Sequence, residues 1–334
     1  MRLRITVRPA LSSRLRLILC LVLIAGVGLF TAVAYVGSTR RLATQANDTF
    51  QRITDDYAAS LMENIEGHGD MLYATRGLST ATTIKSQTWS SFIRGQYAFD
   101  RYPGLQVLGL ARTVEASAIA AHETRTQKEI GKPFKIHPRV DGRQVVLDYI
   151  ETRGVDSPND SPALGFNLMS EPIRKKAIEQ ADASGNITAT APVKLVGRKG
   201  PGFLLILPLS SPDGFRTYSV SALDIQTLVE GTLQSPLNRY STALLLADTT
   251  DAAPHILYST PAPTGNVVKR TVTIQIANRQ WEATFQAPKN AMHVATGRFA
   301  PLALLAGGIV IMLVVAVMFY SMSIRKRLHR LTSP

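Results

Sequence analysis

Two long stretches without a charged residue lie near the ends of this 334-residue chain and constrain its fold more than any other feature. The first runs for 23 residues from Leu17 to Thr39, and the second runs for 26 residues from Phe299 to Ile324. A helix of about 20 apolar residues crosses the hydrocarbon core of a bilayer, because each residue adds about 1.5 Å along the helix axis. We therefore predict two transmembrane helices, over residues 17–37 and 299–324.

Basic residues flank each apolar stretch on its outer side. Residues 1–16 include five arginines, residues 325–334 include three arginines and one lysine, and neither segment has an acidic residue. Short segments rich in Lys and Arg stay in the cytoplasm. We therefore predict a two-pass protein of the cell (inner) membrane with two cytoplasmic tails, 1–16 and 325–334, and a central domain that is periplasmic or extracellular.

The two tails also account for most of the net charge. The chain has 37 Lys and Arg residues against 24 Asp and Glu residues, a formal net charge of +13. Nine of these surplus charges lie in the tails, which leaves the central domain at +4. The central domain also lacks zinc-finger spacing and RNA-binding aromatic motifs, so nucleic acid is not an expected partner.

The first apolar segment has a second interpretation as a cleaved signal peptide. Ala32-Val33-Ala34 fits the small-residue cleavage pattern. The apolar run is longer than the about 7 to 15 residues of a typical signal core, which favours a retained helix. Whether this segment is cleaved stays open from the sequence.

Residues 38–104 are expected to form a stalk and helical region. Apolar side chains recur there at steps of three, four or seven residues, the period of an amphipathic helix: Phe50, Ile53, Tyr57, Leu61, Ile65 and Leu72. Such a seam either pairs two copies of the chain or packs on the external domain. Both interpretations stay open, and we expect a homodimer.

The pattern changes after Tyr102-Pro103-Gly104 to short apolar runs separated by turn residues. Residues 134–140 and 144–151 read as two strands joined at Asp141-Gly142, which predicts a hairpin. Short helices mixed with antiparallel strands predict an α+β fold. We expect two sheet-bearing lobes, 105–234 and 235–298.

Residues that carry catalysis or bind metal form no recognisable group. None of the six histidines belongs to an HxxxH, HExxH or Cys/His pattern, and phosphate-binding glycine loops and the GxSxG motif are missing from the sequence. We expect no catalytic residues, no metal and no cofactor, and therefore no enzyme.

Several segments together resemble the CHASE domain, the extracellular sensor module of bacterial and plant receptors. The best-matched block runs from Gly165 to Ser211 and contains GFNLMSEPIRKKAIEQADASGN, the pair Ala191-Pro192 and GFLLILPLSS, and LQVLGLARTV precedes it. The resemblance implies a long stalk helix followed by two PAS-like α/β lobes between the two transmembrane helices. It also implies that the membrane-distal lobe, 105–234, holds the ligand.

The resemblance also implies ligand-binding residues. Asn167 matches the aspartate that hydrogen-bonds the ligand in cytokinin-binding members, Ala189 matches a main-chain contact, and Leu205, Ile206 and Leu207 match an apolar wall. An amide donates and accepts hydrogen bonds, whereas a carboxylate only accepts them, so the ligand is expected to differ from adenine-type cytokinins. The alternative for Asn167 is that it caps or tethers the adjacent helix.

The expected function is that of a membrane-anchored extracytoplasmic sensor, which binds a small-molecule signal and transmits it across the membrane. Family members usually carry a kinase, cyclase or phosphodiesterase domain after the second span, whereas ten residues follow Ile324 here. We therefore expect a sensor without its own output domain that acts on a separate cytoplasmic signalling protein, or the sensory half of a truncated receptor kinase or diguanylate cyclase. An envelope protein-interaction module without a small-molecule ligand is the alternative from another class.

Overall fold

The computed structural model describes residues 13–154, 161–196, 200–210, 216–292 and 299–331. The turn expected at Ser211-Pro212-Asp213-Gly214 and the outer parts of both predicted tails lie outside these residues. The chain divides into two compact units, one made of residues 1–50 with 292–334 and the other of Gln51–Ala291.

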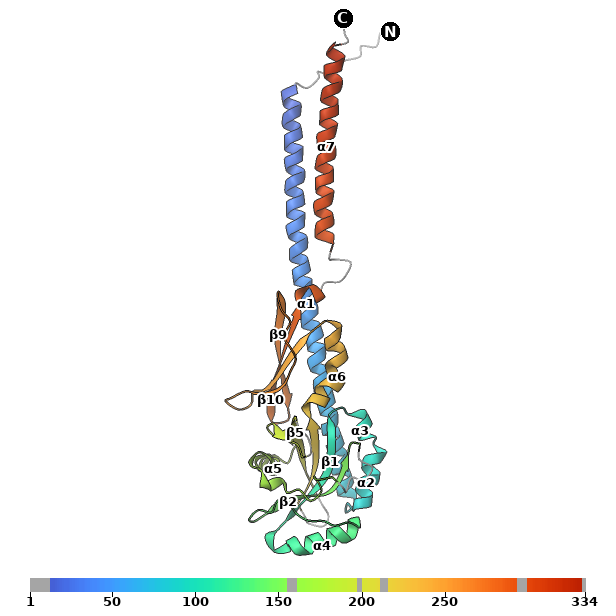
Figure 1. Ribbon diagram of the computed structural model, residues 1–334, viewed down its shortest axis with the longest axis vertical. Helices are drawn as coiled ribbons and strands as arrows, with labels where there is room; N and C mark the ends of the chain where they lie inside the picture. Colours follow the sequence, from blue (N-terminus) through green and yellow to red (C-terminus); the bar gives the residue numbers. More distant parts are fainter. Residues whose placement is uncertain (1–12, 155–160, 197–199, 211–215, 293–298, 332–334) are drawn as a thin grey trace. The chain divides into compact units, whose positions relative to one another are not determined.

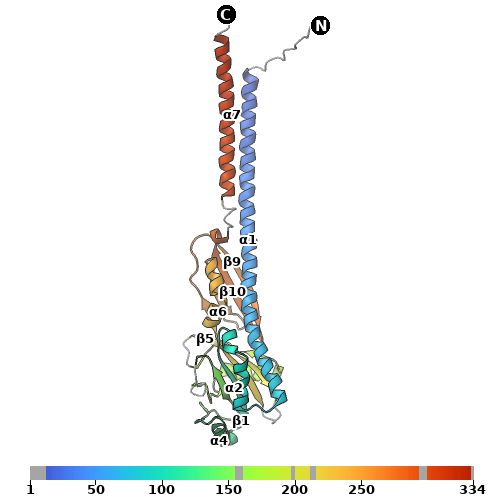
Figure 2. The same ribbon diagram turned by 90° about the vertical axis from the view of Figure 1, so that its right-hand side faces the viewer.

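The first unit contains the beginning of α1 (Ser13–Ala81) and the whole of α7 (Ala300–Leu331), which lie side by side (Figure 2). Both helices are long and apolar enough to cross a membrane, and large apolar side chains such as Phe30 are exposed on them. A side chain at Gly308 of α7 would overlap Thr31 of α1, so the glycine permits close approach of the two helices. Both predicted spans are therefore helical.

The second unit begins with residues 51–81 of α1, whose apolar seam is buried inside the chain. Leu61 and Leu72 are fully buried, and the ring of Tyr57 lies 5.8 Å from that of Phe285. The Tyr57 hydroxyl donates a hydrogen bond of 2.7 Å to the main-chain oxygen of Pro236. Of the two interpretations of the seam, packing on the external domain is the one that these contacts match.

Two short helices and a strand follow α1. They are α2 (Ser86–Gly95), which buries Trp89 and Ile93 completely, α3 (Ala98–Arg101), and β1, which starts at Leu105.

The distal sheet is antiparallel and has the strand order β2-β1-β6-β5-β3, with β4 paired to β5. Its strands are β1 (Leu105–Val114), β2 (Gln144–Thr152), β3 (Thr188–Ala189), β4 (Val193–Lys194), β5 (Pro201–Leu209) and β6 (Thr217–Asp224). Residues 187–196 form two short strands, β3 and β4, on either side of Pro192, which has no N–H for a ladder bond.

Helix α5 (Pro172–Ser184) covers one face of the distal sheet (Figure 1). The Glu171 side chain caps its N-terminus by accepting a hydrogen bond from the Arg174 N–H, and Gly185 ends it with a φ of +67°. Ile178 of α5 packs in one core with Ile206 of β5. This core surrounds the candidate site.

Helix α4 (Ile119–Ile130) is held to the distal sheet by a buried polar network. The Asp148 carboxylate lies 2.8 Å from Nε2 of His122 and accepts a hydrogen bond of 3.1 Å from Arg112. All three side chains are buried, so each charge has an opposite or hydrogen-bonding partner.

The proximal sheet has the order β8-β7-β10-β9 and is also antiparallel. Its strands are β7 (Ala243–Asp248), β8 (His255–Ser259), β9 (Val267–Ile276) and β10 (Arg279–Pro288), and α6 (Ile225–Arg239) connects β6 to β7. The expected boundary between residues 234 and 235 falls inside α6. Phe203 of β5 and Trp281 of β10 meet edge to face at 5.0 Å, and this contact joins the two sheets.

The hairpin predicted between residues 134–140 and 144–151 is wrong. The segment around Phe166 lies between them: the His137 N–H donates to the Gly165 oxygen, and the Leu147 N–H donates to the Phe166 oxygen. Gly165 has a φ of +77°, and a side chain there would collide with the main-chain oxygen of Lys135. Residues distant in sequence therefore take the hydrogen bonds that a local hairpin would have used.

Candidate ligand cavity in the distal lobe

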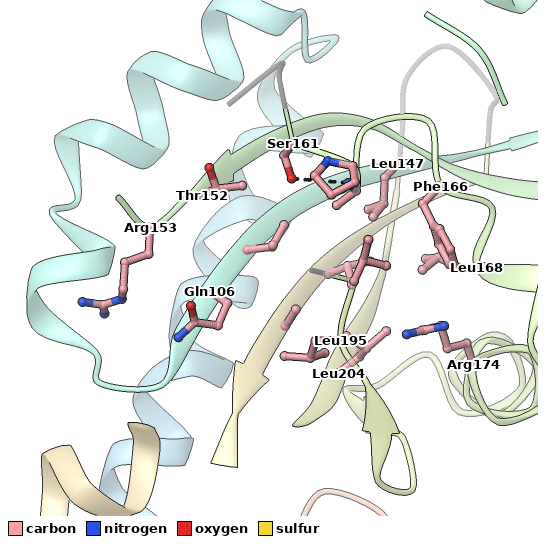
Figure 3. Close-up of a pocket in the computed structure, with 16 residues that line it drawn as sticks. Gln106, Leu147, Thr152, Arg153, Ser161, Phe166, Leu168, Arg174, Leu195 and Leu204 are labelled. Atoms are coloured by element: carbon pink, nitrogen blue, oxygen red, sulfur yellow. Dashed lines mark hydrogen bonds between the residues drawn. The ribbon is translucent and has the colours of Figure 1, made fainter. Parts of the chain in front are cut away.

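A cavity of about 210 Å³ lies on the α5 side of the distal sheet (Figure 3). Apolar side chains from three strands, from the residue after β4 and from the segment before α5 form most of its wall: Leu147, Leu168, Leu195, Leu204, Val220 and Ala222. Polar side chains join them at the ends, with Gln106, Thr152 and Arg153 on one side and Arg174 on the other (Figure 3). This is a largely apolar site with a few polar groups, as is typical of small-molecule sites.

A β-bulge turns Gln106 toward the cavity. In the pairing of β1 with β6, Leu105 lies opposite Leu223 and Val107 lies opposite Ala222, so Gln106 is an extra residue in the ladder. Successive residues of a regular strand point to opposite faces, but here both Gln106 and Val107 line the cavity. Periodicity in the sequence could not reveal this residue.

The Gln106 amide and the Thr152 hydroxyl keep hydrogen-bonding capacity inside the protein. Nε2 of Gln106 donates a hydrogen bond of 3.3 Å to the Gly104 oxygen, while its Oε1 is buried without a partner. Oγ1 of Thr152 is also buried without a partner. Because most buried polar groups are hydrogen-bonded, these two atoms are candidates for contact with a ligand.

Arg174 brings a buried positive charge to the other end of the cavity. Only 6% of the residue is exposed, and its guanidinium lies 5.0 Å from the centre of the Phe166 ring. Its Nη2 donates a hydrogen bond of 2.8 Å to the Lys194 oxygen, and its Nη1 lies 3.5 Å from the Glu171 carboxylate. Burial lowers the pKa of Arg174, and attraction to Glu171 offsets only part of this effect.

Arg153 has a different role, because its guanidinium is bound to main-chain carbonyls. Nε donates to the Leu105 oxygen and Nη2 donates to the Tyr102 oxygen, both at 2.9 Å. These bonds fix the end of β2 against the start of β1. We regard Arg153 as part of the wall that positions its neighbours.

Asn167, the residue matched to the ligand-binding aspartate, has all of its amide hydrogen bonds made within the protein. Its Oδ1 accepts from the N–H groups of Val145 and Met169, and its Nδ2 donates to Gln144 and to the Pro138 oxygen. The side chain is fully buried and is not part of the cavity lining. These bonds match the alternative in which Asn167 tethers the segment before α5, and its neighbours Phe166 and Leu168 line the cavity instead.

None of the other four expected site residues is among the described residues that line the cavity. Ala189 pairs with Leu205 in the β3–β5 ladder, and its N–H donates a hydrogen bond of 2.7 Å to the Asn278 side chain. Ile206 lies in the core beside the cavity, whereas Leu205 lies on the opposite face of β5 against α1 residues such as Ile65. Leu207 is two residues after Leu205 on the same strand, so the two side chains point to the same face of the sheet.

Sequence reasoning missed the residues with the strongest polar character in this site. Arg174 lies inside the block that resembles the CHASE family, three residues after the helix-capping Glu171, but a basic residue in a polar helix usually points to solvent. Among the residues that the structure describes, no group of three or more His, Cys, Asp or Glu side chains could hold a metal ion.

Comparison with known proteins gives a family match and several distant structural likenesses. The CHASE domain family model matches residues 82–258, which is more than half of the chain. A comparison with curated proteins finds no match.

Three solved structures illustrate the likenesses. The extracellular ligand binding receptor from Desulfohalobium retbaense DSM5692 is 12% identical with a TM-score of 0.39 over 74% of this chain, which spans 39% of that receptor. The ligand binding domain of the Pseudomonas aeruginosa PAO1 amino acid chemoreceptor PctC, in complex with GABA, is 12% identical with a TM-score of 0.42. The match covers 72% of this chain and 98% of that domain. The periplasmic sensory domain of the Campylobacter jejuni chemoreceptor Tlp1 is 9% identical with a TM-score of 0.46. The match covers 77% of this chain and 98% of that domain.

The matched region of the family model includes α2, the whole distal sheet, α5 and the first half of the proximal sheet. It therefore contains every residue that lines the cavity. The resemblance carried by Gly165–Ser211 is confirmed, and this chain belongs to the CHASE domain family.

Proposed function

We propose that this protein is a membrane-anchored sensor that binds a small molecule in the distal cavity and transmits its presence across the membrane. The observation that carries the proposal is the cavity of about 210 Å³ inside an otherwise buried sheet and helix core. Protein interiors are close-packed, so a space in the core with an apolar wall and polar groups at its ends supports a binding site.

The lining favours binding over catalysis. Its charged side chains are the two arginines, Arg153 and Arg174, and none of the described lining residues is Asp, Glu, His or Cys. Ser161 and Thr152 also line the cavity, but a hydroxyl nucleophile needs a neighbouring base, and the described lining supplies no carboxylate, histidine or lysine for that role. We therefore propose a receptor domain with no catalytic activity in this cavity.

The cavity also favours a sensor over an envelope interaction module. A module that recognises only another protein needs no internal space, and its distal lobe would be filled by side chains. The space between Leu204, Val220 and Leu147 supports small-molecule binding instead.

Membrane anchoring is supported by the two apolar helices that flank the CHASE region along the chain. The arginines and lysine outside those helices favour a cytoplasmic position of both ends, with Gln51–Ala291 on the periplasmic side. A homodimer and a separate cytoplasmic signalling protein complete the proposal. A ligand transmits a signal only if it binds one arrangement of the protein better than another.

The experiment is a thermal-shift titration of the full-length protein in lipid nanodiscs with a broad metabolite panel. We expect at least one compound to raise the melting temperature, because a ligand that binds only the folded state stabilises it. The variant Ala222→Leu fills part of the cavity, so its unliganded stability should equal or exceed that of the wild type while its ligand-induced shift disappears.

Leu205→Met is the matched control, since Leu205 lies on the other face of the same sheet. It should keep the ligand-induced shift. A panel that produces no shift at all, or a shift that Ala222→Leu leaves intact, contradicts the proposed function.

A further inference from the structure

Among the described residues that line the cavity, every charged side chain is positive. Two arginines line it, and the described lining contains no acidic side chain. Arg153 donates to the Leu105 and Tyr102 oxygens at one end, whereas Arg174 lies at the other end beside the Phe166 ring. A buried cation is costly unless it is paired.

The Arg174 side chain is only loosely paired within the protein. Glu171 is its closest carboxylate, but Nη1 is 3.5 Å from it, beyond the usual distance of about 2.7–2.9 Å for a strong charge-assisted hydrogen bond. The Glu171 side chain is 33% exposed, so water screens the pair, and Glu171 also caps α5 through the Arg174 N–H. Phe166 and the Lys194 oxygen hold the guanidinium in place.

The opposite end of the cavity has the complementary character. Oε1 of Gln106 is a buried acceptor without a partner, and the bond from its Nε2 to the Gly104 oxygen fixes which way the amide faces. The partnerless Thr152 hydroxyl lies on the neighbouring strand, where Thr152 is paired with Val107. Together they suit a hydroxyl or amine hydrogen on a ligand.

The middle of the cavity is apolar, and its size limits the ligand. A cavity of about 150 Å³ holds benzene, which has six non-hydrogen atoms. The cavity of about 210 Å³ therefore holds a ligand of about eight to ten non-hydrogen atoms. The aliphatic wall formed by Leu147, Leu204 and Val220 would contact the body of such a ligand.

We propose that the ligand is a small organic anion with its carboxylate, or a similar anionic group, on Arg174, an apolar body along the leucines, and a hydrogen-bond donor near Gln106 and Thr152. The inference rests on the proposed sensor function of the same cavity and names the chemical class that the cavity selects.

The test uses three matched probes on the full-length protein in nanodiscs of phosphatidylcholine. Hexanoate and 6-hydroxyhexanoate are carboxylates of fitting size, and hexanamide is the neutral isostere of hexanoate. Isothermal calorimetry should give a tenfold or greater preference for hexanoate over hexanamide, since hydrogen bonds to charged groups are about twice as strong as neutral ones. The added hydroxyl of 6-hydroxyhexanoate should tighten binding by about fivefold.

Two variants assign the anion to Arg174. Arg174→Gln should weaken hexanoate binding about tenfold or more while leaving hexanamide binding within about twofold. Arg216→Gln is the control for net charge, because Arg216 is 58% exposed, pairs with Asp182 and lies outside the cavity lining. It should change neither affinity.

A third variant, Gln106→Met, tests the far end. It should abolish the advantage of 6-hydroxyhexanoate over hexanoate and leave hexanoate binding unchanged. Melting curves of each unliganded variant show whether it is folded. If Arg174→Gln does not fold, probe binding is measured with Arg174→Lys, which keeps the charge.

The outcomes separate this inference from the proposed function. If the metabolite panel yields ligands that Ala222→Leu blocks, but these are neutral or cationic and insensitive to Arg174→Gln, the ligand class is wrong and the sensor function stands. Carboxylate binding that Arg174→Gln leaves intact overturns the role of Arg174. If no compound binds, the proposed function and the inference both fail.

Discussion

The Asn167 amide nitrogen donates a hydrogen bond of 2.7 Å to Oε1 of Gln144, and both side chains are fully buried. Gln144 in turn donates to the Val140 and Gly142 oxygens, so the pair closes the loop before β2 onto the segment before α5. Asn167 also bridges Val145 and Met169 through its oxygen. The position that resembles a ligand contact therefore anchors two segments that frame the cavity.

Asn167→Asp should destabilise the domain strongly. An ionised carboxylate cannot donate to Gln144 Oε1 or to the Pro138 oxygen, and it would face both acceptors in a buried site. We expect a loss of about 2–4 kcal/mol in the free energy of unfolding at neutral pH. Asn186→Asp, at an exposed amide, should change it by less than about 0.5 kcal/mol.

The same substitution should make stability depend on pH. The two acceptors and the burial raise the folded-state pKa of the introduced carboxyl above its unfolded value, so the folded state keeps its proton longer. The protonated form is tolerated at low pH, and stability is lost as the pH rises through the raised pKa. Urea unfolding at pH 5 and pH 8 checks this, and equal losses at both values would contradict it.

His68 should give the wild-type protein an acid-sensitive step. Burial lowers the pKa of His68 to about 4, against the smaller opposing effect of the hydrogen bond with the Pro103 oxygen. The unfolded chain therefore binds a proton between about pH 6.5 and 4 that the folded chain does not, and stability falls as the pH drops through this window.

The loss attributable to His68 should reach about 2–3 kcal/mol at pH 4. His68→Gln, which stays neutral, should flatten the dependence of unfolding free energy on pH between 6.5 and 4. His255→Gln is the matched control at an exposed histidine and should leave the slope unchanged. If both variants keep the wild-type slope, another group is responsible.

Glu123 should stabilise the domain at neutral pH and lose this effect in stronger acid. Burial acts to raise the pKa of Glu123, but hydrogen bonds from Lys135, Arg139 and the Ile136 N–H lower it to about 2. A lowered folded-state pKa gives stability that is present above the unfolded value and is lost as the pH falls from about 4.5 to 2.

Glu123→Gln should therefore cost about 1–3 kcal/mol at pH 7, and the difference from wild type should shrink toward pH 2. Lys135 and Arg139 are largely exposed, so water screens their ion pairs with Glu123 and limits the loss. Glu179→Gln, at an exposed carboxylate on α5, should show no comparable pH-dependent difference. A constant deficit for Glu123→Gln at all pH values would argue against the ionic contribution.

Leu204 and Leu205 should respond differently to truncation, because they lie on opposite faces of β5. Leu204→Ala enlarges the cavity and should shift binding toward carboxylates that are longer by one or two methylenes. Leu205→Ala should lower the free energy of unfolding by about 2–4 kcal/mol and leave ligand size preference unchanged. Calorimetry with hexanoate, heptanoate and octanoate distinguishes these outcomes, and a change of size preference in Leu205→Ala would contradict the assigned faces.

Local pattern was enough to predict the two apolar helices and one strand of the distal sheet. The two apolar stretches became parts of α1 and α7, and residues 144–151 became most of β2. The failed hairpin at residues 134–140 shows the limit of local pattern. The main chain of His137 is hydrogen-bonded to Gly165 and Asn167, almost 30 residues later in the chain. The strand propensity of residues 134–140 carries no information about such a distant partner.

The sequence by itself determined the apolar segments, the α+β class and the family, because composition, hydrophobic period and the order of short motifs can be read from neighbouring residues. Only the tertiary structure decided which side chains meet at the cavity. The bulge at Gln106, the face of Leu204 and the inward position of Arg174 depend on how strands register and where helix α5 packs. Successive residues of a strand face opposite sides of the sheet, so Leu204 lines the candidate cavity and Leu205 does not. Phe166 and Leu168 line it on either side of Asn167.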